Sequence, residues 1–226
     1  MWLALDTATD RASLALGRPG EVLARETIVG ARNHAGALLP ALAGCLARIG
    51  RTEEEIEGIV LADGPGSFTG LRVGAALAKA IVRVQRVPLW IAPSLLVCGA
   101  AKMPALEGVV LAVSNALRGE LFAAAYRFHP GRVETVLDPM VITPASLLQR
   151  VPSPSRIVGP AAPTLGAQPT WPDAGDLLEL VGLAGGVTLT ENASEWEPVY
   201  GRPAEAQAVW ERTHGRPLAD PPRPAS

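Results

Sequence analysis

The sequence predicts an α/β protein made of two similar units, from its composition and from the order of its apolar runs. Of its 226 residues, 48% are hydrophobic and 19% are charged, a balance typical of a globular chain with a sizeable core. The length accommodates one large domain or two of about 110 residues each. Within the first hundred residues strand and helix patterns alternate, which predicts a mixed sheet flanked by helices.

Three short apolar runs separated by turn residues open the chain, at Trp2–Asp6, Ser13–Gly17 and Glu21–Val29. They predict an antiparallel meander. Leucines at helical spacing then predict a helix from about His34 to Ile49, with Asn33 as its N-cap. Pro40 lies inside this helix, and we expect it to kink the helix or to mark a later start.

The next elements alternate between strands and helices around a loop rich in glycine. Gly50 ends the first helix, and Thr52–Glu55 has the pattern of a capping box. We then expect a strand at Gly58–Asp63, a loop at Gly64–Gly70, a helix at Leu71–Gln85, a strand at Val87–Ile91 and a helix at Pro93–Lys102.

Met103 and Pro104 mark a boundary between two lobes. Beyond it we expect strands at Val109–Val113, Leu121–Phe128 and Val133–Val141, a helix at Pro144–Arg150, a strand at Arg156–Val158 and a helix at Asp176–Leu183. This order repeats the opening of the first lobe. The sequence therefore predicts an N-terminal lobe at 1–103, a smaller C-terminal lobe at 104–210 and a disordered, proline-rich tail at 211–226.

Charge and cysteine content exclude several classes of function. The net charge of −2 argues against a dedicated nucleic-acid binder, because phosphate contacts need a basic surface. The two cysteines, Cys45 and Cys98, exclude a disulfide scaffold or a zinc knuckle. The N-terminus lacks the pattern of a targeting signal, and no charge-free run has the length of a membrane span. We therefore expect a soluble, cytoplasmic protein with no membrane partner.

Two turns that follow predicted strands are candidates for binding an anion. The loop at Gly64–Gly70 opens a helix, where backbone amides bind anions; the alternative is a tight turn in which glycine permits close packing. A hairpin such as Asp6–Thr9 can wrap a phosphate. Together the turns predict a degenerate phosphate cradle made of Asp6, Thr7, Thr9, Gly64, Gly66 and Ser67, without the lysine that usually tightens such a site.

The chain lacks the residue patterns of common catalytic sites. No two of its three histidines, His34, His129 and His214, lie within one helical turn, so no paired-histidine metal site is expected. Ser67 does not lie in the Gly-x-Ser-x-Gly pattern of a nucleophile elbow. We therefore predict that the isolated chain has no catalytic residues and no metal.

The predicted helices have unusually apolar outer faces. Opposite the leucine stripe of the first helix lie small residues, among them Ala37, Ala41 and Gly44. In the second helix, Arg72 and Lys79 belong to one narrow charged stripe. Two interpretations remain open: burial within the same domain, or packing against a partner's helix, which small residues allow at close range.

Several motifs closely resemble the TsaB family, also called YeaZ. They are Leu5–Thr9, His34 in a leucine-rich helix and Gly64–Gly74, with Gly119–Phe122 and Pro198–Pro203 as weaker matches. The resemblance covers about residues 1–210. It implies a two-lobed actin-like fold of the ASKHA, RNase H-like kind, and a role in making the threonylcarbamoyl modification of the tRNA adenosine beside the anticodon.

The resemblance also implies partners, because TsaB is the non-catalytic partner of TsaD in that family. TsaD carries the metal and performs the transfer, and the ATPase TsaE joins them. This implies a heterodimer with a TsaD-like transferase, a TsaE-like ATPase, only indirect contact with tRNA, and a homodimer as the alternative state of the lone chain. It implies a partner interface at His34, Ala37, Ala41, Gly44, Arg72 and Lys79, and no tightly bound cofactor, with ATP or ADP held only weakly or in the complex.

The chain departs from the family at Asn115–Leu117, which reads Asn-Ala-Leu where relatives often have Asp-Ala-Arg. An acid and a base are lost there. Two other functions remain open: a small actin-like ATP-dependent transferase or kinase acting alone, and a homodimeric structural protein. The missing base and metal ligands argue against the first, and co-purification of a TsaD-like protein would exclude the second.

Overall fold

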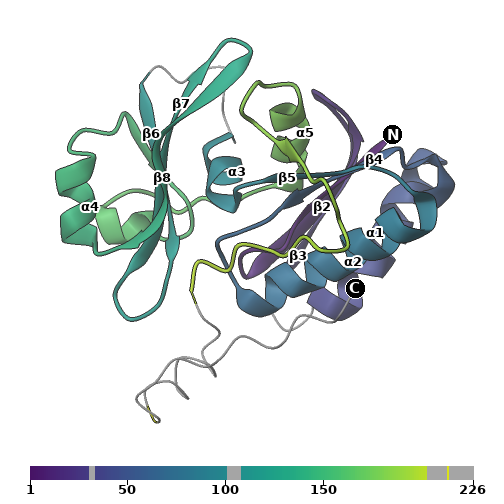
Figure 1. Cartoon of the computed structure of the whole chain (residues 1–226), viewed down its shortest axis with the longest axis horizontal. Helices are drawn as coiled ribbons and strands as arrows, with labels where there is room; N and C mark the ends of the chain where they lie inside the picture. Colours follow the sequence, from purple (N-terminus) through teal and green to yellow (C-terminus); the bar gives the residue numbers. More distant parts are fainter. Residues whose placement is uncertain (31–33, 101–107, 203–212, 214–226) are drawn as a thin grey trace.

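The computed structural model describes residues 1–30, 34–100, 108–202 and 213, and contains two mixed sheets (Figure 1). The first sheet has the strand order β10-β5-β4-β1-β2-β3. Its strands are β1 (Trp2–Asp6), β2 (Arg11–Arg18), β3 (Glu21–Val29), β4 (Gly58–Ala62), β5 (Leu89–Ala92) and β10 (Thr188–Leu189). β1, β2 and β3 pair antiparallel, and β4 and β5 continue parallel to β1. The predicted meander is confirmed.

Helices cover both faces of the first sheet. α1 (His34–Ile49) and α2 (Phe68–Gln85) lie side by side on one face, and α3 (Ser94–Ala100) and α5 (Ala174–Val181) pack on the other (Figure 1). β1 shows how the sequence divides these faces. Leu3 and Leu5 point to the core under α1 and α2, whereas Ala4 points to the core under α3 and α5. This alternation follows from the two-residue period of a strand.

The second sheet repeats the topology of the first. Its strands are β6 (Val109–Asn115), β7 (Leu121–His129), β8 (Arg132–Ile142) and β9 (Arg156–Val158), in the order β8-β7-β6-β9. β6, β7 and β8 form an antiparallel meander, and β9 returns parallel to β6 after α4 (Pro144–Arg150). The recurrence of the strand–strand–strand–helix–strand unit is confirmed, and with it the two-lobed actin-like fold.

The helix boundaries differ from the prediction at the start of α2 and in α5, which spans Ala174–Val181 where Asp176–Leu183 was expected. α2 begins at Phe68, three residues before the predicted start, because the Ser67 side chain caps it by accepting a hydrogen bond from the Gly70 amide at 3.2 Å. α1 begins at His34 and contains Pro40, so the later start is wrong. Pro40 lies on the exposed side of α1, where water can solvate the carbonyl oxygen left without an amide partner. The predicted N-cap, Asn33, lies outside the described residues.

The chain returns to the first sheet after completing the second. The sequence assigns residues 104–210 to the second lobe, but α5 packs on β1 to β4, and β10 pairs with β5. The stretch between β9 and α5 contains a short 3-10 helix at Ala162–Leu165, like the one at Glu53–Glu55 predicted from its capping box. The predicted tail at 211–226 lies outside the described residues except for Thr213. Within the described ranges, no helix is long and apolar enough to cross a membrane.

Candidate functional site

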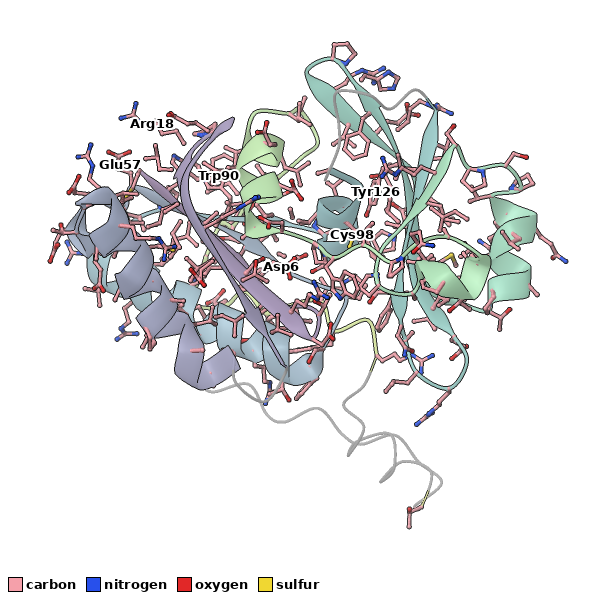
Figure 2. The ribbon with its side chains drawn as sticks, turned by 180° about the vertical axis from the view of Figure 1, so that it is seen from behind. Asp6, Arg18, Glu57, Trp90, Cys98 and Tyr126 are labelled. Carbon is pink, nitrogen blue, oxygen red and sulfur yellow. The ribbon has the colours of Figure 1, made fainter. Side chains whose placement is uncertain are left out.

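The two predicted anion-binding turns meet at one edge of the first sheet. Asp6 ends β1, and Asp63 directly follows β4, the parallel neighbour of β1. The hairpin that follows Asp6 and the loop that follows Asp63 are joined by a hydrogen bond of 2.7 Å from the Ser67 amide to the Ala8 carbonyl. Figure 2 shows Asp6 at the end of the first sheet that faces Cys98 and Tyr126. The structure therefore brings the cradle residues together.

Glycines let the start of α2 pack directly on the hairpin. A Cβ atom at Gly66 would lie 2.4 Å from the Ala8 carbonyl oxygen, and one at Gly70 would lie 2.0 Å from that of Thr7. At Gly74 it would lie 2.4 Å from the Thr7 Oγ1 atom. These distances are below any tolerated contact, so the glycine spacing reflects close packing between helix and hairpin. The structure thus favours the packing interpretation of the glycine-rich loop.

Three backbone amides around the cradle are already engaged inside the protein. The Ala8 amide donates to Asp6 Oδ1 at 2.9 Å, and the Arg11 amide donates to Thr9 Oγ1 at 3.1 Å. The Gly64 amide donates to the Ser94 hydroxyl at 2.9 Å. Since each of these donors is satisfied locally, none of the three is available to hold an anion in this conformation. The buried Thr7 Oγ1 atom, in contrast, has no hydrogen-bond partner among the described residues.

We therefore predict that the isolated chain binds Mg-ATP and Mg-ADP with dissociation constants weaker than about 1 μM, which corresponds to roughly −8 kcal/mol. Isothermal titration calorimetry with each nucleotide measures this, with Mg²⁺ alone as the control. A submicromolar constant for either nucleotide would mean that the hairpin and the loop rearrange into a working site.

Three carboxyl groups are buried or half-buried: Asp6 and Asp63 at the ends of neighbouring strands, and Asp176 in the first turn of α5. Burial raises the pKa of Asp6 to about 7, against the opposing effect of the hydrogen bond from the Ala8 amide. It also raises the pKa of Asp63 and of Asp176 to about 7. The Oδ2 atoms of Asp6 and Asp176 have no hydrogen-bond partner among the described residues. None of the three is salt-bridged within the described ranges, so these residues favour the neutral acid form.

This burial makes stability depend on pH. An aspartate whose pKa rises from 3.8 to about 7 on folding binds a proton more tightly in the folded state, so stability falls as the pH rises through that window. Above pH 7 the folded protein carries the ionised carboxylate, so the whole free-energy cost of burying this charge lowers its stability. We predict that Asp6→Asn, which keeps an acceptor for the Ala8 amide, stabilises the fold by on the order of 2 kcal/mol more at pH 8 than at pH 5.

Urea unfolding of wild type and Asp6→Asn at both pH values measures this difference. Asp138→Asn, at an exposed aspartate of β8, is the matched control and should give the same small change at pH 5 and pH 8. An Asp6→Asn effect that is independent of pH would contradict the burial of a neutral carboxyl group.

The described residues offer no cluster of three or more histidine, cysteine or acidic side chains able to hold a metal ion. His129 ends β7, and its Nε2 atom lies 3.2 Å from Glu134 Oε2 on the adjacent strand, a partly exposed pair. Cys45 and Cys98 are free and buried. The side chain of His34 and all of His214 lie outside the described residues.

The predicted interface residues of α1 lie at the edge of its exposed face. Ala37, Ala41 and Gly44 are half-buried, and Ala41 packs against the core beneath the helix. Many of the exposed residues of α1 and α2 are also apolar, although Arg48, Arg72 and Arg83 are exposed as well. We call the exposed apolar residues the outer face: Leu39, Pro40, Ala43 and Ala47 of α1, and Ala76, Ala80 and Val84 of α2. Sequence reasoning missed Leu39 and Val84, which are 58% and 81% exposed. Their helical spacing from the buried leucines was the available signal.

The two cations predicted for the interface are engaged by a distant part of the chain. Arg72 Nε donates to the Tyr200 hydroxyl at 3.3 Å, and the Arg72 guanidinium lies 4.4 Å from the centre of the Phe68 ring. Lys79 Nζ donates to Glu197 Oε1 at 2.8 Å. Residues that follow β10 therefore cover the flank of α2 that carries these cations.

The departure at Asn115–Leu117 lies in the β6–β7 hairpin. Asn115 Oδ1 accepts a hydrogen bond of 2.7 Å from the Leu117 amide. Leu117 and Arg118 adopt left-handed backbone conformations, with φ of 66° and 54°, which are uncommon for side chains other than glycine and asparagine. Leu117 is 57% exposed. The asparagine thus shapes a tight hairpin that presents an apolar side chain to solvent.

Comparison with known proteins shows that this chain is similar to proteins of tRNA threonylcarbamoyladenosine biosynthesis. The family model described as TsaD, tRNA N6-adenosine threonylcarbamoyltransferase, matches residues 21–163. The tRNA threonylcarbamoyladenosine biosynthesis protein TsaB of Escherichia coli K12 is 31% identical, over 87% of this chain and 84% of its own length. The corresponding protein of Bacillus subtilis 168 is 29% identical, over 69% and 68%.

A solved structure shows the same fold. YeaZ from Pseudomonas aeruginosa superposes with a TM-score of 0.71 at 24% identity, covering 88% of this chain and 98% of that one. The superposition agrees with the duplicated strand order of the two lobes. On the strength of the match to the E. coli protein over most of both lengths, this chain belongs to the TsaB (YeaZ) family.

Proposed function

We propose that this protein acts in tRNA threonylcarbamoyladenosine biosynthesis as a non-catalytic subunit that binds a TsaD-like transferase, with a TsaE-like ATPase as the third component. The pathway follows from family membership, since the E. coli and B. subtilis relatives carry that biosynthetic role in their names. The observation that supports the subunit role is the outer face of α1 and α2, which leaves apolar side chains in solvent.

The outer face has the composition of an interface. It joins two adjacent helices that cover the same side of the first sheet (Figure 1). Leu39 and Val84 contribute large apolar side chains, and Ala43, Ala47 and Ala80 allow the close approach of another helix. Contiguous exposed apolar surface on a soluble protein commonly marks a protein interface. Burial against helices of a partner would remove this surface from water.

The carboxyl ends of β1 and β4, where Asp6 and Asp63 lie, support a role without catalysis. Asp6 and Asp63 are buried, and the amides around them are satisfied within the chain. A carboxyl group that acts as a general base must reach the substrate, and a metal-assisted reaction needs more ligands than these. We propose that any ATP or ADP is bound weakly by the lone chain or only within the complex. Contact with tRNA would then be made through the partners.

Co-purification tests this proposal. A tagged copy of the chain, expressed at native level in its own organism, should recover a TsaD-like transferase in equal amount. Mixing the two purified proteins should give a 1:1 complex by analytical ultracentrifugation. If the chain neither recovers nor binds the transferase, and sediments only as a monomer or a homodimer, the proposed subunit role is wrong.

A further inference from the structure

The segment Asn192–Arg202, which follows β10, runs along α2 and then crosses toward the second sheet (Figure 1). We call it the latch segment. It begins with a turn in which Asn192 Oδ1 accepts a hydrogen bond of 3.0 Å from the Ser194 amide. Trp196 packs against the core between the first sheet and its helices. Glu197 then pairs with Lys79, which anchors this half of the segment to α2.

The middle of the latch segment binds the loop after β4. The Val199 amide donates to the Asp63 carbonyl at 2.8 Å. Gly64 accommodates the Val199 carbonyl oxygen so closely that a Cβ atom at Gly64 would lie 2.0 Å from it. The Tyr200 ring stacks on Phe68 at a centroid distance of 4.6 Å. All of these contacts are with the first lobe.

The end of the latch segment contacts the second lobe. Arg202 forms an ion pair with Glu120, which lies directly before β7. Gly201 is wedged between the lobes, because a Cβ atom there would lie 2.7 Å from both Pro65 Cβ and Phe122 Cε1. Gly201 also has a φ of 70°, which side chains rarely adopt. Two consecutive residues therefore tie the second sheet to the loop after β4.

We propose that the latch segment is a releasable clasp that adds to the apolar core shared by the two lobes in holding them closed, and that Gly201 and Arg202 are its moving part. The two halves of the latch segment are attached with different strength. The first half is fixed by the partly buried Trp196, which packs against the core, whereas the second half crosses the lobe boundary through a partly exposed ion pair, with Arg202 22% and Glu120 36% exposed. Ion pairs of that exposure contribute little free energy and exchange readily with water.

Cys98 reports whether the lobes separate. It is buried in α3, between Asp6 and Asp176 of the first lobe and Tyr126 of the second (Figure 2). Burial raises the pKa of its thiol, which keeps it unreactive while the lobes are closed. Cys45 is a buried residue of α1 in the separate core beneath α1 and α2, so it reacts only if the first lobe itself unfolds. The full chain thus contains both a reporter and an internal control.

Thiol labelling with iodoacetamide, resolved by residue in a mass spectrometer, tests the proposal. Arg202→Glu replaces the ion pair with two facing carboxylates, and we expect Cys98 to react several-fold faster than in wild type while Cys45 is unchanged. The charge-swapped double variant Glu120→Arg/Arg202→Glu should restore slow labelling. Glu197→Lys, which breaks only the contact with α2 in the first lobe, is the matched control and should leave Cys98 protected.

Gly201→Val should separate the lobes in a second way, because the valine side chain cannot fit between Pro65 and Phe122. It too should speed labelling of Cys98 but not of Cys45. The proposal is overturned if Cys98 stays as protected as in wild type in both Arg202→Glu and Gly201→Val. Equal acceleration at Cys45 would overturn it as well, because the variants would then act by unfolding. These outcomes do not depend on which partner the protein binds.

Discussion

Gly70→Ala is expected to destabilise the fold by about 3 kcal/mol or more. The added methyl group would lie 2.0 Å from the Thr7 carbonyl oxygen, a backbone atom that cannot rotate away. To relieve the contact, α2 must move off the hairpin, which separates the Ser67 amide from the Ala8 carbonyl. Unfolding in urea measures the loss, and for a chain of this size the melting temperature should fall by roughly 6–12 °C.

Gly36→Ala is the matched control for this change. Gly36 also lies in a helix, but a Cβ atom there would meet nothing within 4 Å. Alanine favours the helix over glycine by up to about 1 kcal/mol, so Gly36→Ala should stabilise the chain slightly. If Gly70→Ala were tolerated as well as Gly36→Ala, the close packing of α2 on the hairpin would not be required for folding.

Ala43→Glu is expected to weaken binding of a TsaD-like transferase at least 100-fold while leaving the melting temperature nearly unchanged. Ala43 lies on the outer face of α1, in solvent, so a carboxylate there costs the free chain little. On association the charge would be desolvated without a partner, which commonly costs several kcal/mol. Affinity measured by calorimetry, together with the thermal melt of the same sample, separates the two effects.

Two further variants sharpen this test. Ala41→Glu places the charge where the side chain packs against the core, so it should lower both the affinity and the melting temperature. Leu148→Glu changes an exposed apolar residue of α4, on the far side of the second sheet (Figure 1), and should alter neither. Wild-type affinity in Ala43→Glu would show that the outer face is not the binding surface.

The sequence was sufficient to predict those elements whose signals are local. The alternation from Trp2 to Val29 predicts the meander, and the leucines of α1 predict its buried side. The repeated strand order could be read for the same reason, since each hairpin and helix has its own pattern. The glycine-rich loop was placed correctly between β4 and α2, although α2 begins inside its predicted bounds. Its residue types alone could not separate an anion site from close packing.

What the sequence could not predict depends on contacts between distant segments. The residue pattern of Ala174–Val181 does not indicate that this helix packs on the first sheet, because its apolar stripe could pack on either sheet. The pairing of Lys79 with Glu197 joins residues far apart in the chain, so the sequence could only place Lys79 in a charged stripe and in the implied partner interface. The buried state of Asp6 was hidden for a related reason, since α5 packs on β1 and Cys98 of α3 lies close to Asp6.

Reconstitution of the modification reaction tests most directly the claim that the protein is a non-catalytic subunit. The purified chain is incubated with threonine, bicarbonate, ATP and unmodified tRNA, first alone and then with the TsaD-like transferase and the TsaE-like ATPase. The account predicts no threonylcarbamoyladenosine from the chain alone, and product that depends on the chain when the partners are present. Product formed by the chain alone, or formed equally well by the partners without it, would contradict the account.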